Sequence, residues 1–179
     1  MLFALCFLSL VVKVAMISFV MEPSAPNWVI HPGNMNEAAD VFSLQKKAYQ
    51  AEARLYDDPK IPPLTQTLGD LIAEYRQKAF LSAWQDGAIV GSVRAFMQKD
   101  TCYISRLMVD PDAQGQGIGF ALMQRIEKHF PMAERYELTT GDRNRWDLRF
   151  YKRMGYGILK TELVSKKLTL VYLEKKKTT

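Results

Sequence analysis

Hydrophobic positions follow two different periods along this chain, and the period changes where strands are expected to give way to helices. Short alternating or continuous apolar runs indicate strands, whereas apolar spacings of three and four residues indicate helices. The strands are predicted over residues 28–31, 80–84, 88–93, 102–109, 137–140, 156–162 and 167–174. The helices are predicted over residues 37–56, 68–78, 116–130 and 144–154.

Polar residues and glycines at the ends of these segments support the boundaries. Asp86-Gly87 favours a tight two-residue hairpin turn between two of the strands. Asn36 and Thr67 are expected to cap the first two helices, because their side chains can accept a hydrogen bond from the first turn. Gly155 follows the last helix and is a natural C-terminal cap.

The order of these elements predicts the fold class. One strand, two helices, three strands, a helix, a strand, a helix and two strands form an α/β (α+β mixed) pattern. We expect a mixed sheet with helices on both faces, in which two parallel neighbours flank the helix that begins near residue 116. Neither internal repeats nor low-complexity segments occur in the sequence.

The first residues differ in character from the rest. Residues 2–21 are almost wholly apolar except for Lys13, and residues 22–27 form a proline-rich joint. The apolar segment has three interpretations that the sequence leaves open: a non-essential extension preceding a later start, a membrane anchor, or a packed or cleaved segment. We therefore divide the chain into an extension at 1–26, one domain at 27–174 and a basic tail at 175–179.

Composition narrows the class of protein. Of the 179 residues, 48% are hydrophobic and 24% charged, as expected of one globular domain. The net charge of +5 is too small and too dispersed to indicate a nucleic-acid partner. Two cysteines, Cys6 and Cys102, and two histidines, His31 and His129, show neither metal-ligand spacing nor a disulfide framework, so we expect no metal.

The strongest chemical signal is a glycine-rich turn after an apolar strand. Residues 107–111 end in Asp-Pro, and residues 114–119 read Gln-Gly-Gln-Gly-Ile-Gly at the start of a helix. Backbone N–H groups at such a helix start converge on a small volume and can hold a phosphate. The nucleotide P-loop is excluded because the chain has no Gly-Lys pair, and the dinucleotide fingerprint is excluded by the Gly-x-Gly-x-Gly spacing.

This turn resembles the acyl-coenzyme A loop of the GCN5-related N-acetyltransferases (GNAT family), whose signature is Gln/Arg-x-x-Gly-x-Gly/Ala. Gln114, Gly117 and Gly119 match it. Residues 144–156 are similar to the second motif of that family, Asn-x-x-Ala-x-x-hydrophobic-Tyr-x-x-x-Gly-aromatic, except that Asp147 replaces the usual alanine. The resemblance covers residues 27–174. It implies a six- to seven-stranded, mostly antiparallel sheet with one splayed parallel strand pair.

The resemblance also implies roles for particular residues. Acetyl-coenzyme A is the expected cosubstrate, with its pantetheine arm beside the strand that ends at residue 109 and its pyrophosphate on the glycine loop. Asn144 is expected to contact the cofactor arm, and Tyr151 to act as general acid for the departing thiolate; a purely structural role for Tyr151 stays open. The cofactor-binding residues are Leu107, Met108, Val109, Gln114, Gly115, Gln116, Gly117, Ile118, Gly119, Asn144 and Tyr151.

The group that deprotonates the acceptor is less clearly marked. Some members of the family carry a glutamate on the strand before the glycine loop, but residues 103–109 contain no carboxylate. Glu137 and Glu52 are the candidate bases, with a solvated or ion-paired Glu137 as the alternative. Residues that could line the acceptor pocket are Tyr49, Gln50, Glu52 and Gln66; an ordinary amphipathic helix surface is their alternative role.

The sequence thus predicts an N-acetyltransferase that moves an acetyl group from acetyl-coenzyme A to a primary amine. Two alternatives remain: a non-catalytic acyl-coenzyme A-binding module on the same fold, and a membrane-tethered interaction protein whose support is confined to residues 2–21. The expected partners are acetyl-coenzyme A and an amine acceptor, and a homodimer stays open. The expected location is cytoplasmic, or membrane-anchored if residues 2–21 are an anchor.

Overall fold

The computed structural model describes residues 26–177 and contains seven strands and six α-helices in that range. The strands are β1 (Trp28–Pro32), β2 (Ala79–Gln85), β3 (Ala88–Gln98), β4 (Thr101–Val109), β5 (Arg135–Gly141), β6 (Gly157–Ser165) and β7 (Leu168–Lys176). The helices are α1 (Ala38–Ala48), α2 (Gln50–Tyr56), α3 (Pro62–Thr65), α4 (Leu68–Tyr75), α5 (Ile118–His129) and α6 (Arg145–Arg153). Short 3₁₀ turns, η1 (Met35–Glu37) and η2 (Pro111–Ala113), precede α1 and the glycine loop.

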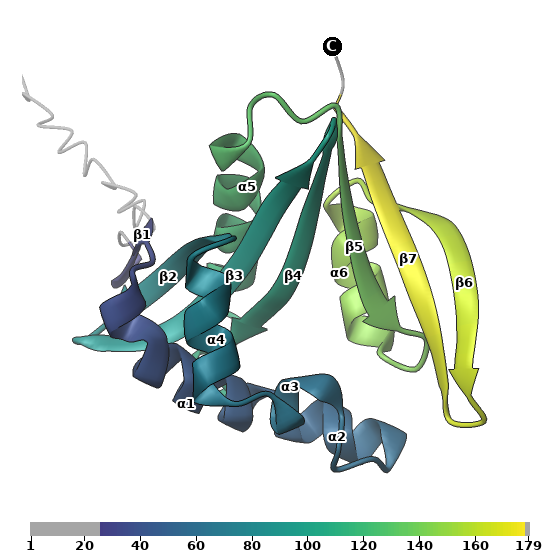
Figure 1. Cartoon of the computed structure of the whole chain (residues 1–179), viewed down its shortest axis with the longest axis horizontal. Coiled ribbons are helices and arrows are strands. Elements are labelled where there is room, and N and C mark those ends of the chain that lie inside the picture. The colour runs from purple at the N-terminus through teal and green to yellow at the C-terminus, as the bar shows by residue number, and fades with distance from the viewer. Residues whose placement is uncertain (1–25, 178–179) are drawn as a thin grey trace, which may run out of the picture.

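All seven strands form one sheet in the order β1-β2-β3-β4-β5-β7-β6. Every neighbouring pair is antiparallel except β4 and β5, which are parallel and flank α5. This arrangement confirms the predicted mixed, mostly antiparallel sheet with one parallel pair. In Figure 1, β4 and β5 meet at one end and then diverge, so that the sheet opens like a V.

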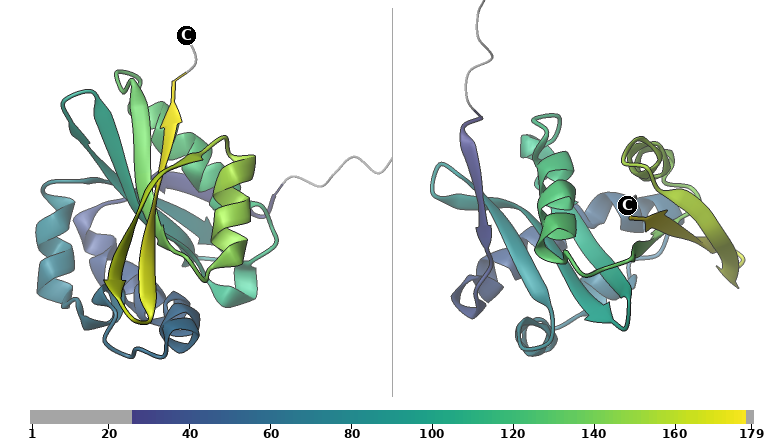
Figure 2. Two further views of the ribbon diagram at one scale, coloured as in Figure 1. Left: turned by 90° about the vertical axis from the view of Figure 1, so that its right-hand side faces the viewer. Right: turned by 90° about the horizontal axis from the view of Figure 1, so that it is seen from above.

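Helices cover both faces of the sheet, as Figure 2 shows from above. One hydrophobic core lies between the sheet and helices α5 and α6; its fully buried members include Val93, Leu122 and Ile126. The second core lies on the opposite face beneath α1 and α4 and includes Val41 and Leu71.

The ends of the helices confirm two of the predicted caps and change a third. Thr67 and Asp70 form a reciprocal capping box at the start of α4. Gly155 adopts a φ of 91° after α6, where the N–H of Tyr156 donates to the Tyr151 carbonyl in a Schellman motif. Asn36 is not a cap, because Asn34 accepts the hydrogen bond from the Asn36 N–H and begins η1 instead.

Several element boundaries differ from the expectation; β3, for example, runs to Gln98 rather than to residue 93. The helix predicted over 37–56 is interrupted at Tyr49, which ends α1 and begins α2. The proline-rich break contains a short helix, α3, in which Pro62 occupies the first position, where its missing N–H is not needed. Strand β7 continues to Lys176, two residues beyond its predicted end, because Lys175 and Lys176 still pair with Tyr136 and Arg135 of β5.

Within residues 26–177, no helix is long and apolar enough to cross a membrane. The predicted extension, including residues 2–21, lies almost wholly outside the described residues.

Candidate active site

The candidate site begins where the parallel pair ends, and we call the interval between the diverging strands β4 and β5 the cleft. Strands β4 and β5 pair only from Thr101 to Tyr103 on β4, with Tyr103 opposite Glu137. Beyond Tyr103, the edge of β4 that faces β5 has no strand partner among the described residues, although β4 stays paired with β3 as far as Val109. The free backbone groups along residues 104–109 can therefore hydrogen-bond to an extended ligand arm inserted between the strands.

The glycine loop lies at the end of β4 and leaves the start of α5 uncapped. Gly117 precedes the helix with a φ of 82°, and its lack of a side chain removes the usual side-chain cap. The N–H groups of the first turn consequently have no helical partner and point out of the helix start, where the helix dipole favours an anion. By contrast, the side chains of Thr67 and Asn144 cap α4 and α6.

Gln116 fixes the orientation of this loop from behind. Its backbone carbonyl accepts a hydrogen bond from the indole of Trp28 at 3.2 Å, and its side-chain oxygen accepts one from the Gln85 amide at 3.2 Å. Both partners lie on strands β1 and β2, away from β5. Gln116, predicted as a cofactor contact, thus anchors the loop to the sheet.

Gly119 marks the ligand side of the loop. Its φ lies outside the left-handed region, so its backbone does not require glycine. A Cβ at this position would meet Val109 of β4 at 3.6 Å and Phe150 of α6 at 3.9 Å, which are ordinary contacts. The bare α-carbon therefore lies between the end of β4 and α6, where a methyl group would fill part of the space available to a ligand. A phosphate-bearing cofactor fits this cradle.

Helix α6 and its N-cap carry three polar residues of the candidate site: Asn144, Asp147 and Tyr151. Asn144 is its N-cap and accepts from the Asp147 N–H at 3.1 Å. Tyr151 lies two turns further on and is buried, with its ring packed edge-on against Phe150 and Tyr156. Among residues 26–177, no group hydrogen-bonds to the Tyr151 hydroxyl. Tyr151 is therefore an aromatic core residue whose phenol remains available to a ligand.

Asp147 occupies the position at which the sequence departs from the family motif. Its Oδ2 accepts hydrogen bonds from Asn144 at 2.8 Å and from the Thr140 hydroxyl at 3.3 Å. Burial raises the pKa of this carboxyl, and the hydrogen bond from Thr140 opposes the increase. In the sequence, Asp147 stands out only as a mismatch to the motif; its spacing of four residues from Tyr151, one helical turn, is the signal that the two share a face.

Asp147 interacts electrostatically with Glu52 of α2 and with Tyr49, and Arg106 of β4 opposes its effect on both. Burial raises the pKa of Glu52, the Asp147 carboxylate adds to the increase, and Arg106 opposes it. Burial also raises the pKa of Tyr49 to about 12. The pKa of Tyr151 is raised well above its ordinary value by burial, and then by Asp147, Tyr49 and Glu52. Asp147 thus raises the pKa of Glu52, Tyr49 and Tyr151, and we refer to these four groups with Arg106 as the Asp147 cluster.

Arg106 is the second residue that the sequence did not single out. It lies in β4 with a φ of 52°, at an irregularity in the pairing of β4 with β3. Its guanidinium lies 5.7 Å from the centre of the Tyr49 ring, and its buried Nε has no hydrogen-bond partner in the described part of the chain. The unusual backbone conformation turns this side chain out of the regular alternation of the strand.

The remaining predicted site residues, Glu137, Gln50 and Gln66, already have ion-pair or hydrogen-bond partners within the protein. Glu137 faces the beginning of the cleft and pairs with Arg135 at 3.2 Å, and Gln50 is exposed and bonds to the Lys46 carbonyl. The Gln66 amide is engaged by three side chains: its oxygen accepts from Gln45 and Arg94, and its nitrogen donates to Glu74 at 3.0 Å.

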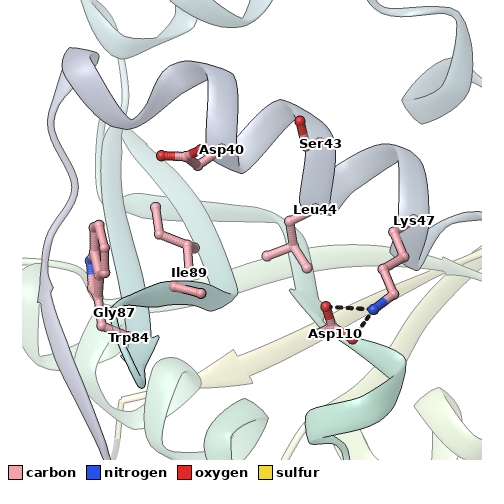
Figure 3. Close-up of a pocket in the computed structure, with 9 residues that line it drawn as sticks. Asp40, Ser43, Leu44, Lys47, Trp84, Gly87, Ile89 and Asp110 are labelled. Atoms are coloured by element: carbon pink, nitrogen blue, oxygen red, sulfur yellow. Dashed lines mark hydrogen bonds and ion pairs between the residues drawn. The ribbon is translucent and has the colours of Figure 1, made fainter.

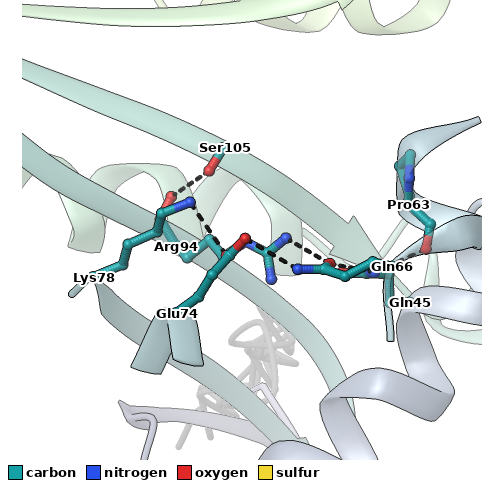
Figure 4. Close-up of polar contacts among 7 residues, drawn as sticks. All are labelled: Gln45, Pro63, Gln66, Glu74, Lys78, Arg94 and Ser105. Atoms are coloured by element: carbon teal, nitrogen blue, oxygen red, sulfur yellow. Dashed lines mark hydrogen bonds and ion pairs between the residues drawn. The ribbon is translucent and has the colours of Figure 1, made fainter. Parts of the chain in front are cut away.

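Figure 4 shows the buried network to which Gln66 belongs. Arg94, only 2% exposed, lies with its Nε 2.8 Å from Glu74 Oε2, and burial lowers the pKa of Arg94 to about 10. The Gln45 amide also donates to the Pro63 carbonyl at 2.9 Å. The network therefore ties β3 to α1, α3 and α4, and fixes the helices that cover the cleft.

A pocket of about 330 Å³ lies elsewhere, between α1 and the β2–β3 turn. Figure 3 shows its polar end, where Lys47 pairs with Asp110, and its apolar lining, which includes Leu44, Trp84 and Ile89. None of the residues predicted to bind cofactor or acceptor lines it.

Comparison with known proteins agrees with this geometry. Residues 40–156, more than half of the chain, match the acetyltransferase (GNAT) family. The chain belongs to this family. The UPF0157 protein YqkA of Bacillus subtilis strain 168 is 28% identical over 119 residues, which are 66% of this chain and 34% of that protein. The chain therefore spans about a third of the length of that relative.

Solved GNAT structures share the fold. The ribosomal-protein-S18-alanine N-acetyltransferase of Escherichia coli matches 85% of this chain and 95% of its own, with a TM-score of 0.71 and 12% identity. The PaiA N-acetyltransferase of Thermoplasma acidophilum, in complex with coenzyme A, matches 84% and 99%, with a TM-score of 0.68 and 16% identity. YncA of Salmonella typhimurium, with its cofactor acetyl-CoA, matches 86% and 95%, with a TM-score of 0.67 and 15% identity.

Proposed function

We propose that this GNAT protein transfers an acetyl group from acetyl-coenzyme A to a primary amine by direct attack. The observation that supports this most strongly is the combination of the unpaired β4 edge with an uncapped α5 start at the same end of the cleft. The β4 edge would bind the pantetheine arm, and the start of α5 would bind the pyrophosphate. The binding of CoA or acetyl-CoA by GNAT proteins of this fold adds to the argument.

Three tasks fall to residues of this chain. The N–H groups of residues 117–119 hold the negative charge of the pyrophosphate, because the helix start is otherwise unsatisfied. The β4 edge holds the thioester in register with the cleft. Tyr151 donates its phenolic proton to the departing thiolate; its raised pKa keeps it protonated at neutral pH.

The test is acetyl-CoA-dependent thiol release with a panel of primary amines, comparing the wild type with Tyr151→Phe. Losing the general acid should lower kcat by about 100-fold, with the dissociation constant of acetyl-CoA changed less than about threefold. Tyr172→Phe is the matched control, because Tyr172 bonds to exposed Glu162 on β6, outside the cleft, and should retain full activity.

The alternative is a non-catalytic acyl-coenzyme A-binding module. It predicts tight binding of acetyl-CoA by the wild type without thiol release for any amine of the panel. The unengaged Tyr151 hydroxyl favours the enzyme, because a binding module has no need for a buried phenol beside the thioester.

A further inference from the structure

Asp147 has a free carboxylate oxygen next to the proposed general acid. Its Oδ2 is used by Asn144 and Thr140, whereas Oδ1 receives no hydrogen bond from any residue between 26 and 177. Asp147 and Tyr151 are four residues apart on α6, so their side chains lie one above the other on the helix surface. One helix thus presents a proton acceptor and a proton donor side by side.

The cluster around Asp147 carries more negative than positive charge. It contains the carboxyl groups of Glu52 and Asp147 and the guanidinium of Arg106, which lies 5.7 Å from the centre of the Tyr49 ring. Arg94 adds no free charge, because it is already paired with Glu74. Neither Glu52 nor Asp147 forms an ion pair with a described residue. With both acids ionised, the cluster has one uncompensated negative charge, and a cation entering it would be bound.

We infer that Asp147 is the catalytic base that takes the proton from the acceptor's ammonium group, with Glu52 as its partner in selecting an alkylammonium acceptor. This inference rests on the proposed acetyl transfer and adds to it the base and the charge of the substrate. Helix α2, which carries Glu52, lies below the open ends of β4 and β5 in Figure 1, so the acceptor is held between α2 and α6.

The proton balance of the reaction is complete with these groups and water. The ammonium gives one proton to Oδ1 of Asp147, and the freed lone pair forms a bond to the thioester carbon. When the carbonyl re-forms, the C–S bond breaks and the thiolate takes the proton of Tyr151. The amide nitrogen then releases its extra proton to water. Asp147 returns its proton to solvent and Tyr151 regains one, so one proton is liberated for each acetyl group transferred.

The raised pKa of Asp147 suits this role, because a base whose pKa lies nearer the working pH holds the abstracted proton better. A purely structural role also exists for this side chain, since Oδ2 belongs to the cap of α6. The experiment must therefore separate proton removal from helix stability.

Two small acceptors achieve this separation: propylamine, which is an ammonium ion at pH 7, and methoxyamine, which is neutral at pH 7. Asp147→Asn retains a side chain of the same size that can still accept from Thr140. With propylamine at pH 7, its kcat/KM should fall by about 100-fold or more. With methoxyamine it should stay within about threefold of the wild type. The loss with propylamine should shrink as the pH rises and the free amine becomes abundant.

Asp147→Glu should recover part of the activity with propylamine, and Glu162→Gln on β6 controls for carboxylate removal elsewhere on the surface. Equal losses with both acceptors, or no loss with either, would overturn the inference while leaving acetyl transfer intact.

A binding measurement covers the case in which the wild type acetylates no amine, which would contradict the proposed function instead. Propylammonium binding to the protein with coenzyme A present is followed by saturation-transfer NMR. Binding weakened at least tenfold by Asp147→Asn supports the ammonium site, and unchanged binding refutes it.

Discussion

Gly119 is a position where the choice of glycine is better explained by ligand binding than by the fold. Its backbone is compatible with any residue, and a Cβ would make only ordinary contacts with Val109 and Phe150. Glycine near the start of a helix lowers helix stability, by up to about 1 kcal/mol relative to alanine. The contacts around Gly119 therefore do not explain why it is a glycine, and we expect its advantage to lie in the ligand's access to the backbone.

We predict that Gly119→Ala leaves the free energy of unfolding unchanged or raises it by up to about 1 kcal/mol. The same change should weaken acetyl-CoA binding by about tenfold or more, because the methyl group takes up space between β4 and α6. Gly69 occupies the same second position in α4, and a Cβ there meets only Thr67 Oγ1 at 3.8 Å. Gly69→Ala should give the same stability change without altering affinity. Calorimetry measures both quantities.

Asp147 leads to a prediction about stability and pH. Because its pKa is raised in the folded state, the folded protein binds more protons than the unfolded chain between the ordinary aspartate pKa, near about 4, and the raised value. The stability contributed by this group therefore falls as the pH rises through that interval. Asp147→Asn lacks the titrating group, so its Tm relative to the wild type should be higher at pH 7.5 than at pH 4.5. A difference that is the same at both pH values would contradict the prediction.

Single residues were predictable from the sequence where a motif prescribes them. The positive φ of Gly117 and the Schellman turn at Gly155 follow from local backbone requirements, which a pattern of adjacent residues can reveal. Asp147 and Arg106 were missed because their significance comes from neighbours far along the chain. Asp147 raises the pKa of Glu52, and the Arg106 guanidinium lies 5.7 Å from the centre of the Tyr49 ring; no local spacing encodes such pairs.

At the scale of elements, α2 connects the two halves of the opened sheet. The Tyr56 hydroxyl at its C-terminal end accepts from the Arg143 N–H at 2.8 Å, in the connection between β5 and α6. Gly141, the last residue of β5, provides the space: a Cβ there would collide with the Tyr56 side chain. Close packing between α2 and the end of β5 thus keeps α2 across the cleft.

Gly141→Ala is expected to destabilise the protein by about 1–3 kcal/mol, because the added methyl must displace Tyr56. It should also raise the KM for the amine more than that for acetyl-CoA, since α2 carries Glu52 and not the glycine loop. Gly157→Ala in β6 is the control, as a Cβ at Gly157 meets nothing within 4 Å. Thermal unfolding and steady-state kinetics of both variants measure these effects. Unaltered Tm and KM in Gly141→Ala would refute the proposed role of the contact.

Most elements could be predicted because their ends carry turn residues and caps. Asp86-Gly87 forms the β2–β3 turn, and Thr67 begins α4. The break at Tyr49 was not predictable, since the helical periodicity continues through it. The inward orientation of the Gln66 side chain was also not predictable, because it depends on a hydrogen bond from the buried guanidinium of Arg94 on a distant strand.

At the scale of the whole molecule, the sheet is weakest where the cofactor is expected. Pairing of β4 with β5 is limited to three residues on each strand, so a ligand bound between them is expected to add to the cohesion of the two halves. A ligand that binds only the folded state stabilises it by mass action, by about 2.7 kcal/mol at one hundred times its dissociation constant.

Coenzyme A at that ratio should therefore raise the Tm by about 5–10 °C, at about 2–4 °C per kcal/mol for a chain of this size. Hydrogen exchange should slow at the amides of residues 104–109 whose N–H groups face β5, because these acquire hydrogen bonds to the pantetheine arm. Amides of β6, at the far edge of the sheet, serve as the internal reference. Protection confined to other strands, or a Tm increase of the same size in Gly119→Ala, would contradict this binding mode.

The bond between Trp28 and the Gln116 carbonyl makes the glycine loop sensitive to the outermost strand of the sheet. Strand β1 is short and pairs with β2 alone. Loosening of β1 would release the carbonyl and let the loop rotate, turning its N–H groups away from a bound pyrophosphate. We therefore expect affinity for the cofactor to depend on the order of β1, a strand that carries none of the residues predicted to bind the cofactor or the acceptor.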